Sequence, residues 1–233
     1  TNILNENDLQ YLWLPLAHVF GKVLLTLPLQ VGFPTAIDGR IDKIVENLAV
    51  VKPTFMGAAP RIFEKAYGRI STMMADEGGV KAKLFSWASG VGREVSALRE
   101  QGKNPGGLLN LQYALSDRII GEKIRERFGG RIRFFISGSA ALNQDIARWF
   151  DAMGMQIAEG YGMTETSAAS FVNRIKAYRY GTVGWPLPGT ESTPFHLRRG
   201  GGLSRSEPGA DEPGDRYAYD PADPVPTFGG VNS

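Results

Sequence analysis

The stretch from Arg131 to Ala158 constrains the fold most, because it reads as strand, helix and strand in immediate succession. Residues 131–136, Arg-Ile-Arg-Phe-Phe-Ile, read as a strand, and residues 155–158, Met-Gln-Ile-Ala, read as another. Between them, Asn143 is a favourable helix cap for a segment that runs to about Met153. Two strands joined by a helix at this spacing form a βαβ unit with parallel strands.

Further elements of the same kinds precede this unit. Short apolar runs at 11–14 and 54–56 predict strands, and helices are expected from about Val19 and over 61–70, with Pro60 at a first helical position. Ile41, Ile44, Val45 and Leu48 have the spacing of one apolar helix face, which Pro53 ends. Residues 76–127 read as helical except at 102–107. The sequence predicts an α/β fold in which helices flank a mainly parallel sheet.

Composition excludes several classes of site. The 233 residues contain no cysteine and two histidines, His18 and His196, so disulfides, zinc–thiolate centres, iron–sulfur clusters and His-rich metal sites are excluded. The formal net charge of +2 gives no support to nucleic-acid binding through a strongly basic surface. The polar, acidic N-terminal residues do not resemble a signal peptide, and the apolar stretch 11–33 is interrupted by proline and charge. We therefore expect a cytoplasmic protein.

The composition changes sharply near Glu191. Residues 192–233 carry six prolines and seven glycines, and their four arginines and six acidic residues leave this tail negatively charged. No apolar run in the tail is long enough for a core element. We expect a body over 1–191 and an irregular tail over 192–233 that is disordered or foreign to the body.

Four loops leave the carboxyl ends of the predicted parallel strands and should therefore lie at one edge of the sheet. Ligands bind along that edge in sheets of this kind. The loops are 15–18, 57–60, 137–141 and 160–165, each small or glycine-rich. Thr164 offers a hydroxyl to a phosphate, Glu165 a hard oxygen ligand for Mg²⁺, and Tyr161 an aromatic face for a base. These features describe a nucleotide-phosphate site; the alternative is tight turns between packed elements. The common phosphate-binding signatures are absent.

Four motifs resemble those of the AMP-forming acyl-CoA synthetases. Residues 159–166, Glu-Gly-Tyr-Gly-Met-Thr-Glu-Thr, look like the adenylate-binding motif of that superfamily. Residues 14–20 resemble its acyl-site motif, 137–142 its adenine loop, and 181–189 its downstream V-G-x-P-x-P-G segment. The helical stretch 83–130 is most similar to the long-chain fatty acid–CoA ligases. The resemblance spans about 5–191 and implies part of the large N-terminal domain of an adenylate-forming enzyme.

This resemblance implies a reaction and a set of site residues. Fatty acid and ATP would form an acyl-adenylate, and CoA would then take the acyl group. Nucleotide binding is implied for Gly138, Ser139, Ala140, Glu159, Gly160, Tyr161, Gly162, Met163 and Thr164; catalysis for His18, Thr164 and Glu165; and Mg²⁺ binding for Glu165. For His18 and Glu165 the alternatives are a satisfied histidine at a strand end and a surface carboxylate. Trp185 is interpreted as a packing residue. The lipid substrate implies peripheral membrane association.

The chain also departs from the pattern of that superfamily. The phosphate loop ending in P-K-G, the Y-x-T-G-D motif and the C-terminal domain with the adenylation lysine are absent from this sequence. Residues 211–230 instead resemble a stretch of the cocaine-esterase type of α/β-hydrolases, without a G-x-S-x-G nucleophile elbow. We expect a fusion near 191–194, with a divergent tail as the alternative. Three interpretations remain: an inactive ligase fragment, a non-catalytic nucleotide-binding remnant, and a hydrolase-related fusion.

Overall fold

The computed structural model describes residues 3–188, 196–198 and 202–206. The chain divides into two compact units, Thr1–Thr190 and Glu191–Ser233. In the second unit, the structure describes one antiparallel pair of strands, β8 (His196–Arg198) and β9 (Gly202–Ser204). The predictions of a disordered or foreign tail and of a hydrolase-like segment fall mostly on residues outside the described ones.

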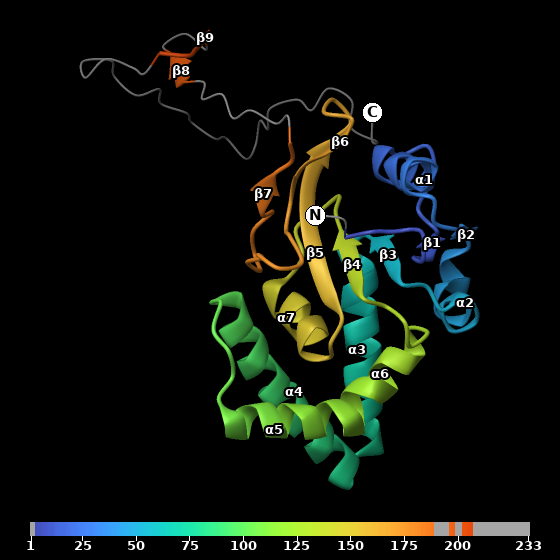
Figure 1. Ribbon diagram of the computed structural model, residues 1–233, viewed down its shortest axis with the longest axis vertical. Coiled ribbons are helices and arrows are strands. Elements are labelled where there is room, and N and C mark those ends of the chain that lie inside the picture. Colours follow the sequence, from blue (N-terminus) through green and yellow to red (C-terminus); the bar gives the residue numbers. More distant parts are fainter. Residues whose placement is uncertain (1–2, 189–195, 199–201, 207–233) are drawn as a thin grey trace, which may run out of the picture. The chain divides into compact units, whose positions relative to one another are not determined.

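The first unit contains one mixed sheet, with strand order β2-β1-β3-β4-β5-β6-β7 (Figure 1). Its first five strands are parallel, whereas β6 and β7 run antiparallel to their neighbours. The strands are β1 (Gln10–Leu12), β2 (Thr35–Ile37), β3 (Phe55–Ala58), β4 (Phe134–Ser137), β5 (Gln156–Met163), β6 (Ala168–Val172) and β7 (Trp185–Pro186). The predicted α/β class with a mainly parallel sheet is confirmed.

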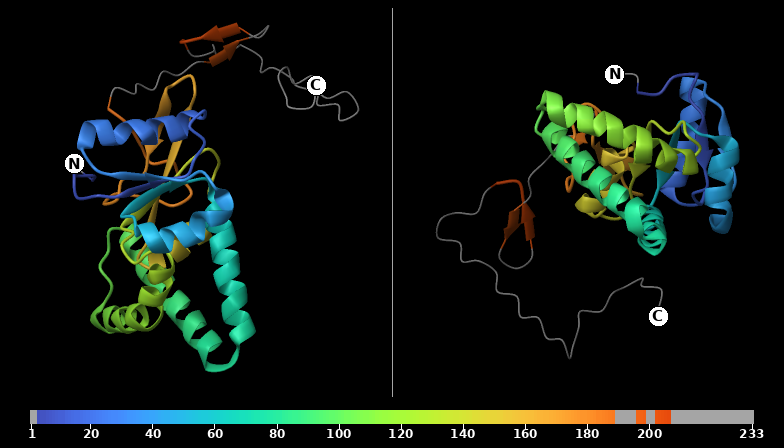
Figure 2. Two further views of the ribbon diagram at one scale, coloured as in Figure 1. Left: turned by 90° about the vertical axis from the view of Figure 1, so that its right-hand side faces the viewer. Right: turned by 90° about the horizontal axis from the view of Figure 1, so that it is seen from below.

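Helices occupy most of the remaining described residues of this unit (Figure 2). They are α1 (Val19–Val31), α2 (Ile44–Val51), α3 (Pro60–Glu77), α4 (Gly79–Glu100), α5 (Gly107–Ser116), α6 (Glu122–Arg127) and α7 (Gln144–Ala152). The predicted βαβ unit is β4-α7-β5, and the Asn143 side chain caps α7 by accepting from the backbone N–H of Asp145 at 2.8 Å. No helix among the described residues is long and apolar enough to cross a membrane.

The central strands β3 and β4 are buried on both faces, which explains why their sequences are mostly apolar. In β4, Phe134 joins a small cluster with Phe33 and Phe55 on one face. Its neighbour Phe135 joins the main core on the other face, where its ring contacts Phe63 of α3. Successive side chains of a strand point to opposite faces, so one Phe-Phe pair connects both layers of the core.

Several local predictions were wrong in ways that have physical causes. The predicted helix face at 41–48 buries only Ile44 and Leu48, because Ile41 starts a separate 3₁₀ turn and Val45 faces outward, 57% exposed. The predicted helical stretch 76–127 is broken at Gly78, whose φ is +59°, and contains a π-helical turn at Asp117–Gly121. Strands β2, β6 and β7 were not predicted. With three and two residues, β2 and β7 are too short to show a period, and the five residues of β6, Ala-Ala-Ser-Phe-Val, do not alternate between apolar and polar.

A buried ionic cluster ties together the segments that enter three parallel strands. The Asp8 carboxylate, 3% exposed, accepts from the Thr54 hydroxyl at 2.6 Å and from the Arg133 guanidinium at 2.6 and 2.7 Å. The backbone N–H of Asn5 donates to the same carboxylate at 3.0 Å. Burial raises the pKa of Asp8, but these hydrogen bonds outweigh burial and hold it below its usual range.

Asp8→Asn is expected to lower the free energy of unfolding near neutral pH by about 2 kcal/mol, because it removes the charge that Arg133 and Thr54 face. A carboxyl whose folded pKa is depressed stabilises the fold above its unfolded pKa of 3.8. That contribution is lost as the pH falls through 3.8 toward the lower folded value. Urea unfolding at a series of pH values should therefore show that the free energy of unfolding falls less at acid pH in Asp8→Asn than in the unchanged chain. Asp76→Asn, at an exposed position, is the control. An equal decrease in the free energy of unfolding at acid pH in the Asp8→Asn and unchanged chains would contradict the prediction.

Candidate functional site

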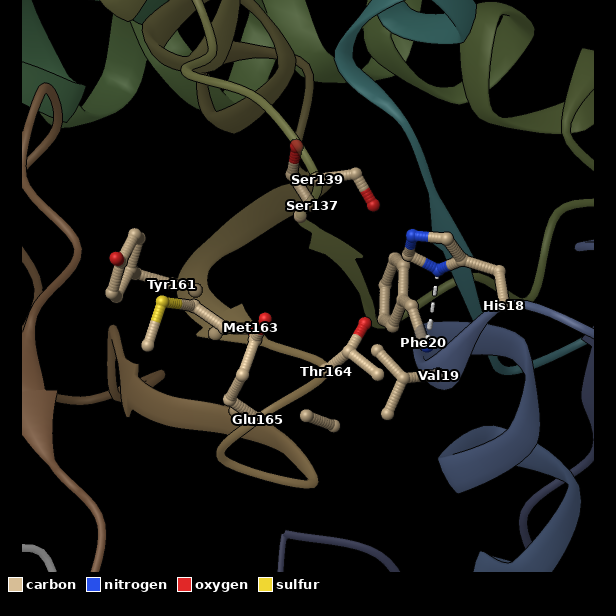
Figure 3. A pocket seen from close by; sticks show the side chains of 14 residues that line it. His18, Val19, Phe20, Ser137, Ser139, Tyr161, Met163, Thr164 and Glu165 are labelled. Carbon is tan, nitrogen blue, oxygen red and sulfur yellow. Dashed lines mark hydrogen bonds between the residues drawn. The ribbon is translucent and has the colours of Figure 1, made fainter. Parts of the chain in front are cut away.

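A cavity of about 290 Å³ lies at the carboxyl ends of the parallel strands, where the sequence predicts a ligand site (Figure 3). Three segments line it: the residues after β1, the end of β4, and the end of β5 with the turn that follows and the start of β6. The lining residues are His18, Val19, Phe20, Ser137, Gly138, Ser139, Gly160, Tyr161, Gly162, Met163, Thr164, Glu165, Ala168 and Ala169. Three of the four predicted loops therefore meet.

His18 stands exposed on one rim of this cavity as the N-cap of α1. Its Nδ1 accepts a hydrogen bond from the backbone N–H of Phe20 at 3.2 Å (Figure 3). In the neutral ring the proton must then sit on Nε2, because Nδ1 is the acceptor. His18 is thus not a buried, satisfied histidine: it offers one N–H donor beside the cavity.

The end of β4 brings two hydroxyls and a small residue to the cavity. Ser137 is fully buried, and its Oγ has no hydrogen-bond partner among the described residues. Ser139 has φ of +73°, a left-handed conformation that costs a non-glycine residue free energy and is common at ligand sites. Gly138 between them lies against the ring of Phe20, where an added Cβ would stand 3.5 Å from the nearest ring carbon. Because the Ser137 Oγ is shielded from solvent, the exposed hydroxyl of Ser139 is the one at this strand end that a ligand can reach.

Residues 160–163 belong to β5 and not to a loop, which corrects the prediction of a loop over 160–165. They pair with β6, and the register shifts between Tyr161 and Gly162, as at a β-bulge. The Tyr161 ring is 48% exposed and lies 6.5 Å, centroid to centroid, from that of Phe171. The shift lets an aromatic residue and backbone groups line the same cavity, because a bulge redirects the side chains that follow it.

Thr164 and Glu165 lie in the tight turn between β5 and β6. The Thr166 hydroxyl organises this turn by donating to the carbonyls of Met163 and Ala168, at 3.1 and 2.9 Å. Ser167 and Ala168 both have positive φ, +56° and +100°, so the turn holds two strained residues. It thereby presents the exposed hydroxyl of Thr164 and carboxylate of Glu165 at the cavity.

Two predicted nucleotide-binding residues do not line the cavity. The Glu159 side chain is buried, and its Oε1 accepts from the backbone N–H of Leu142 at 2.9 Å; burial raises the pKa of this carboxyl despite that bond. Glu159 therefore holds the segment after β4 in place. Ala140 is exposed outside the cavity. The loop at 57–60 is also absent from the lining, because Phe20 and Leu24 cover Gly57.

Sequence reasoning did not name five of the lining residues as site residues: Val19, Phe20, Ser137, Ala168 and Ala169. Phe20 follows His18 by two positions, and its ring closes the space between Gly57 and Gly138. Ser137 was seen only as the first residue of a loop, although a hydroxyl at the end of a buried apolar strand is a signal in the sequence. Phe20 is placed by helix α1 and Ser137 by the end of β4, and the sequence places the bounds of such elements only approximately.

The cavity can bind a planar group and a few polar atoms. Glu165 is its one acidic residue, and no lysine or arginine is among its lining residues. No group of three or more acidic or histidine side chains suited to a metal occurs in the part of the chain that the structure describes. A cation here would need oxygen atoms from a ligand, which is how Mg²⁺ commonly binds beside phosphates.

Comparison with known proteins agrees with this geometry. The sequence profile of the family described as AMP-binding enzyme matches residues 1–193. The long-chain-fatty-acid–CoA ligase FadD15 of Mycobacterium bovis is 32% identical over 187 residues, which is 80% of this chain and 31% of that protein. Long chain acyl-CoA synthetase 3 of Arabidopsis thaliana is 29% identical over 194 residues, 81% of this chain and 28% of that protein.

Among solved structures, a benzoate CoA ligase from Burkholderia xenovorans LB400 is similar in fold. The TM-score is 0.51 at 23% identity, over 86% of this chain and 31% of the other. The chain thus spans about a third of the length of the proteins it matches. On its sequence and on the arrangement of its sheet and cavity, the chain belongs to the AMP-binding enzyme family.

Proposed function

We propose that this chain is part of an AMP-forming long-chain fatty acid–CoA ligase, an acid–thiol ligase, and that its cavity holds the adenylate. One observation carries the proposal. Residues from three separate sequence motifs, represented by His18, Ser139 and Tyr161, line one cavity at the carboxyl ends of a parallel sheet. The long-chain class rests on the two ligases named above, which are 32% and 29% identical to this chain.

The proposed reaction has two steps. A fatty acid carboxylate attacks the α-phosphorus of ATP, which forms an acyl-adenylate and releases pyrophosphate. The CoA thiol then attacks the acyl carbonyl, which forms the thioester and releases AMP. A carboxylate is a poor electrophile, and adenylation supplies the leaving group. The protein's contribution is to orient the anions and stabilise developing charge.

Each lining residue has a role that its position supports. Tyr161 would stack on adenine, with Gly138 and Ser139 beside the base. Thr164 would donate to a phosphate oxygen, and the Nε2–H of His18 to the acyl carboxylate. Glu159 and Ala140, which were expected to touch nucleotide, are not given contact roles here; Glu159 is a positioning residue for the segment after β4.

The residues present fit a nucleotide and one magnesium ion. The Nε2–H of His18 and the exposed hydroxyls of Ser139 and Thr164 offer hydrogen bonds beside the Tyr161 ring. Gly160 and Gly162 let the backbone of β6 pack closely against β5 at the cavity wall. Glu165 would hold Mg²⁺ together with phosphate oxygens. The ion would neutralise the negative charge of the phosphates. A cytoplasmic location and peripheral membrane association through the lipid substrate stay predictions.

Binding of a non-hydrolysable acyl-adenylate analogue to this chain tests the proposal. Tyr161→Ala is expected to weaken binding about tenfold, because stacking of a base on an aromatic ring contributes about 1–3 kcal/mol. Tyr161→Phe keeps the ring and should bind like the unchanged chain. Isothermal titration calorimetry measures the affinity of the analogue for the unchanged chain and for both variants. Micromolar binding that Tyr161→Ala leaves unchanged would refute the site.

Glu165→Ala tests the magnesium role separately. It should weaken binding of the analogue in magnesium-containing buffer and have no such effect when EDTA is present, because only the ion links this carboxylate to the phosphate. Glu64→Ala removes an exposed carboxylate from α3 and serves as the matched control. An effect of Glu165→Ala that persists in EDTA would argue against metal binding at this residue.

A further inference from the structure

A second concave site in the first unit lies between the end of α4 and the segment 173–185. We call it the basic groove; it has a volume of about 610 Å³. Its lining residues are Arg99, Glu100, Gln101, Gly102, Asn173, Lys176, Ala177, Tyr178, Arg179, Thr182, Gly184 and Trp185. None of these lines the cavity at the sheet edge, so the two sites are separate.

The groove carries more positive charge than its acidic residue can balance. Arg99, Lys176 and Arg179 are exposed, and no acidic side chain of the described residues forms an ion pair with them. Glu100 is already satisfied. Its Oε2 accepts from Arg148 at 3.2 Å and its Oε1 from the backbone N–H of Tyr180 at 3.0 Å. The guanidinium of Arg99 lies 4.9 Å from the centre of the Tyr113 ring, whereas Lys176 and Arg179 remain available to an anion from solvent.

Hydrogen bonds fix the backbone that carries two of these cations. Asn173, 3% exposed, accepts from the backbone N–H of Arg179 at 3.1 Å and donates to the carbonyl of Thr182 at 2.6 Å. The Thr182 hydroxyl donates to the carbonyl of Arg179 at 2.8 Å. Gly184, with φ of +76°, lets the chain return against Asn173, where an added Cβ would meet backbone atoms. These hydrogen bonds close the segment into a loop, so its backbone would lose little conformational entropy when a ligand binds.

Trp185 adds an exposed aromatic face to one end of the groove. The prediction that it is a packing residue is wrong, since its side chain is 53% exposed. The guanidinium of Arg174 lies 5.5 Å from the centre of its ring. An exposed indole beside several cations favours a ligand that combines negative charge with a less polar part.

We propose that the basic groove binds a phosphate group carried by a ligand other than the adenylate. Arg99, Lys176 and Arg179 supply the charge, and Trp185 contacts the adjoining part of the ligand. A guanidinium and an ammonium both bind phosphate oxygens well, the first through two parallel N–H bonds. Such a phosphate can come from a soluble phosphate ester or from the headgroup of an anionic lipid, and the test below separates the two sources.

Two probes test the site on the full chain. The first is inorganic pyrophosphate, titrated by calorimetry at low and high salt. The second is sedimentation with phosphatidylcholine vesicles that contain or lack phosphatidic acid. Lys176→Ala and Arg179→Ala should each weaken binding of the effective probe about fivefold, and the double variant should weaken it more. Added salt should weaken binding by the unchanged chain, because exposed charges are screened.

Lys123→Ala on α6 removes an exposed cation outside the groove and is the matched control for net charge. Groove-dependent binding of pyrophosphate identifies a soluble phosphate, and groove-dependent binding of phosphatidic acid vesicles alone identifies a lipid headgroup. Absence of binding to both probes, or equal losses in Lys123→Ala and Lys176→Ala, overturns the proposal. Tyr161→Ala should leave groove binding intact, so this proposal and the adenylate assignment fail independently.

Discussion

Gly162→Ala is expected to weaken binding of the acyl-adenylate analogue at least tenfold while the chain stays folded. Gly162 lies in β5 directly after the register shift and faces the turn that leads into β6. A Cβ built there would stand 2.7 Å from the Cα of Ala169 and nearer still to the carbonyl of Ala168. These are backbone atoms, which cannot rotate away as a flexible side chain would.

Relief of this clash requires β6 to move away from β5. Ala168 and Ala169 line the cavity, so the displacement changes its wall beside Tyr161 and Thr164. Overpacking of this kind typically costs about 1–3 kcal/mol of folding free energy, which leaves most domains folded. The effect on binding should therefore exceed the effect on stability.

Calorimetry with the analogue and urea unfolding measure the two effects. Gly90→Ala is the control, because Gly90 is an exposed residue of helix α4 and an added Cβ there meets nothing within 4 Å. That change should leave binding intact and raise stability by about 0.5–1 kcal/mol, since alanine favours a helix over glycine. Binding by Gly162→Ala at the strength of the unchanged chain would show that β6 does not form the cavity wall.

The parts of the fold that were predictable are those whose signals are local. Asn143 predicts the start of α7, because a capping side chain acts within one turn of its helix. The adjacent Phe134 and Phe135 indicate a strand that is buried on both faces. The predicted face that included Ile41 and Val45 failed for the opposite reason. Their spacing suits a helix face, but which turns are helical, and what they pack against, depends on distant segments.

The candidate site was predictable in its location and only partly in its members. The carboxyl-end rule for parallel sheets brings His18 together with Ser139 and Tyr161, which lie more than a hundred residues further along the chain. Glu159 adjoins the same motif, yet the alternation of a strand turns its side chain toward Leu142 and away from the cavity. Phe20 enters the site because a helix places it over Gly57, a contact that no local pattern contains.

Trp149 is the residue whose loss should cost the fold most. It lies in α7, fully buried, and its ring contacts Tyr67 of α3 at 5.0 Å, Phe85 of α4 at 6.2 Å and Phe150 at 5.2 Å between centroids. Its indole N–H donates to the Ser89 hydroxyl at 3.3 Å. One side chain thus joins three helices. Because α7 connects β4 to β5, the same contacts hold the two strands whose ends form the cavity.

Trp149→Ala is expected to lower the free energy of unfolding by about 3–5 kcal/mol, since it removes a large buried ring and leaves a cavity that the surrounding aromatic residues cannot fill. Small domains have about 5–15 kcal/mol in total, so analogue binding should fall with the folded fraction. Urea unfolding followed by circular dichroism measures the loss. Trp185→Ala removes the same side chain from an exposed position and should change stability by less than about 1 kcal/mol. Equal losses in the two variants would mean that α7 is not packed as described, and the cavity built on β4 and β5 would then lose its structural basis.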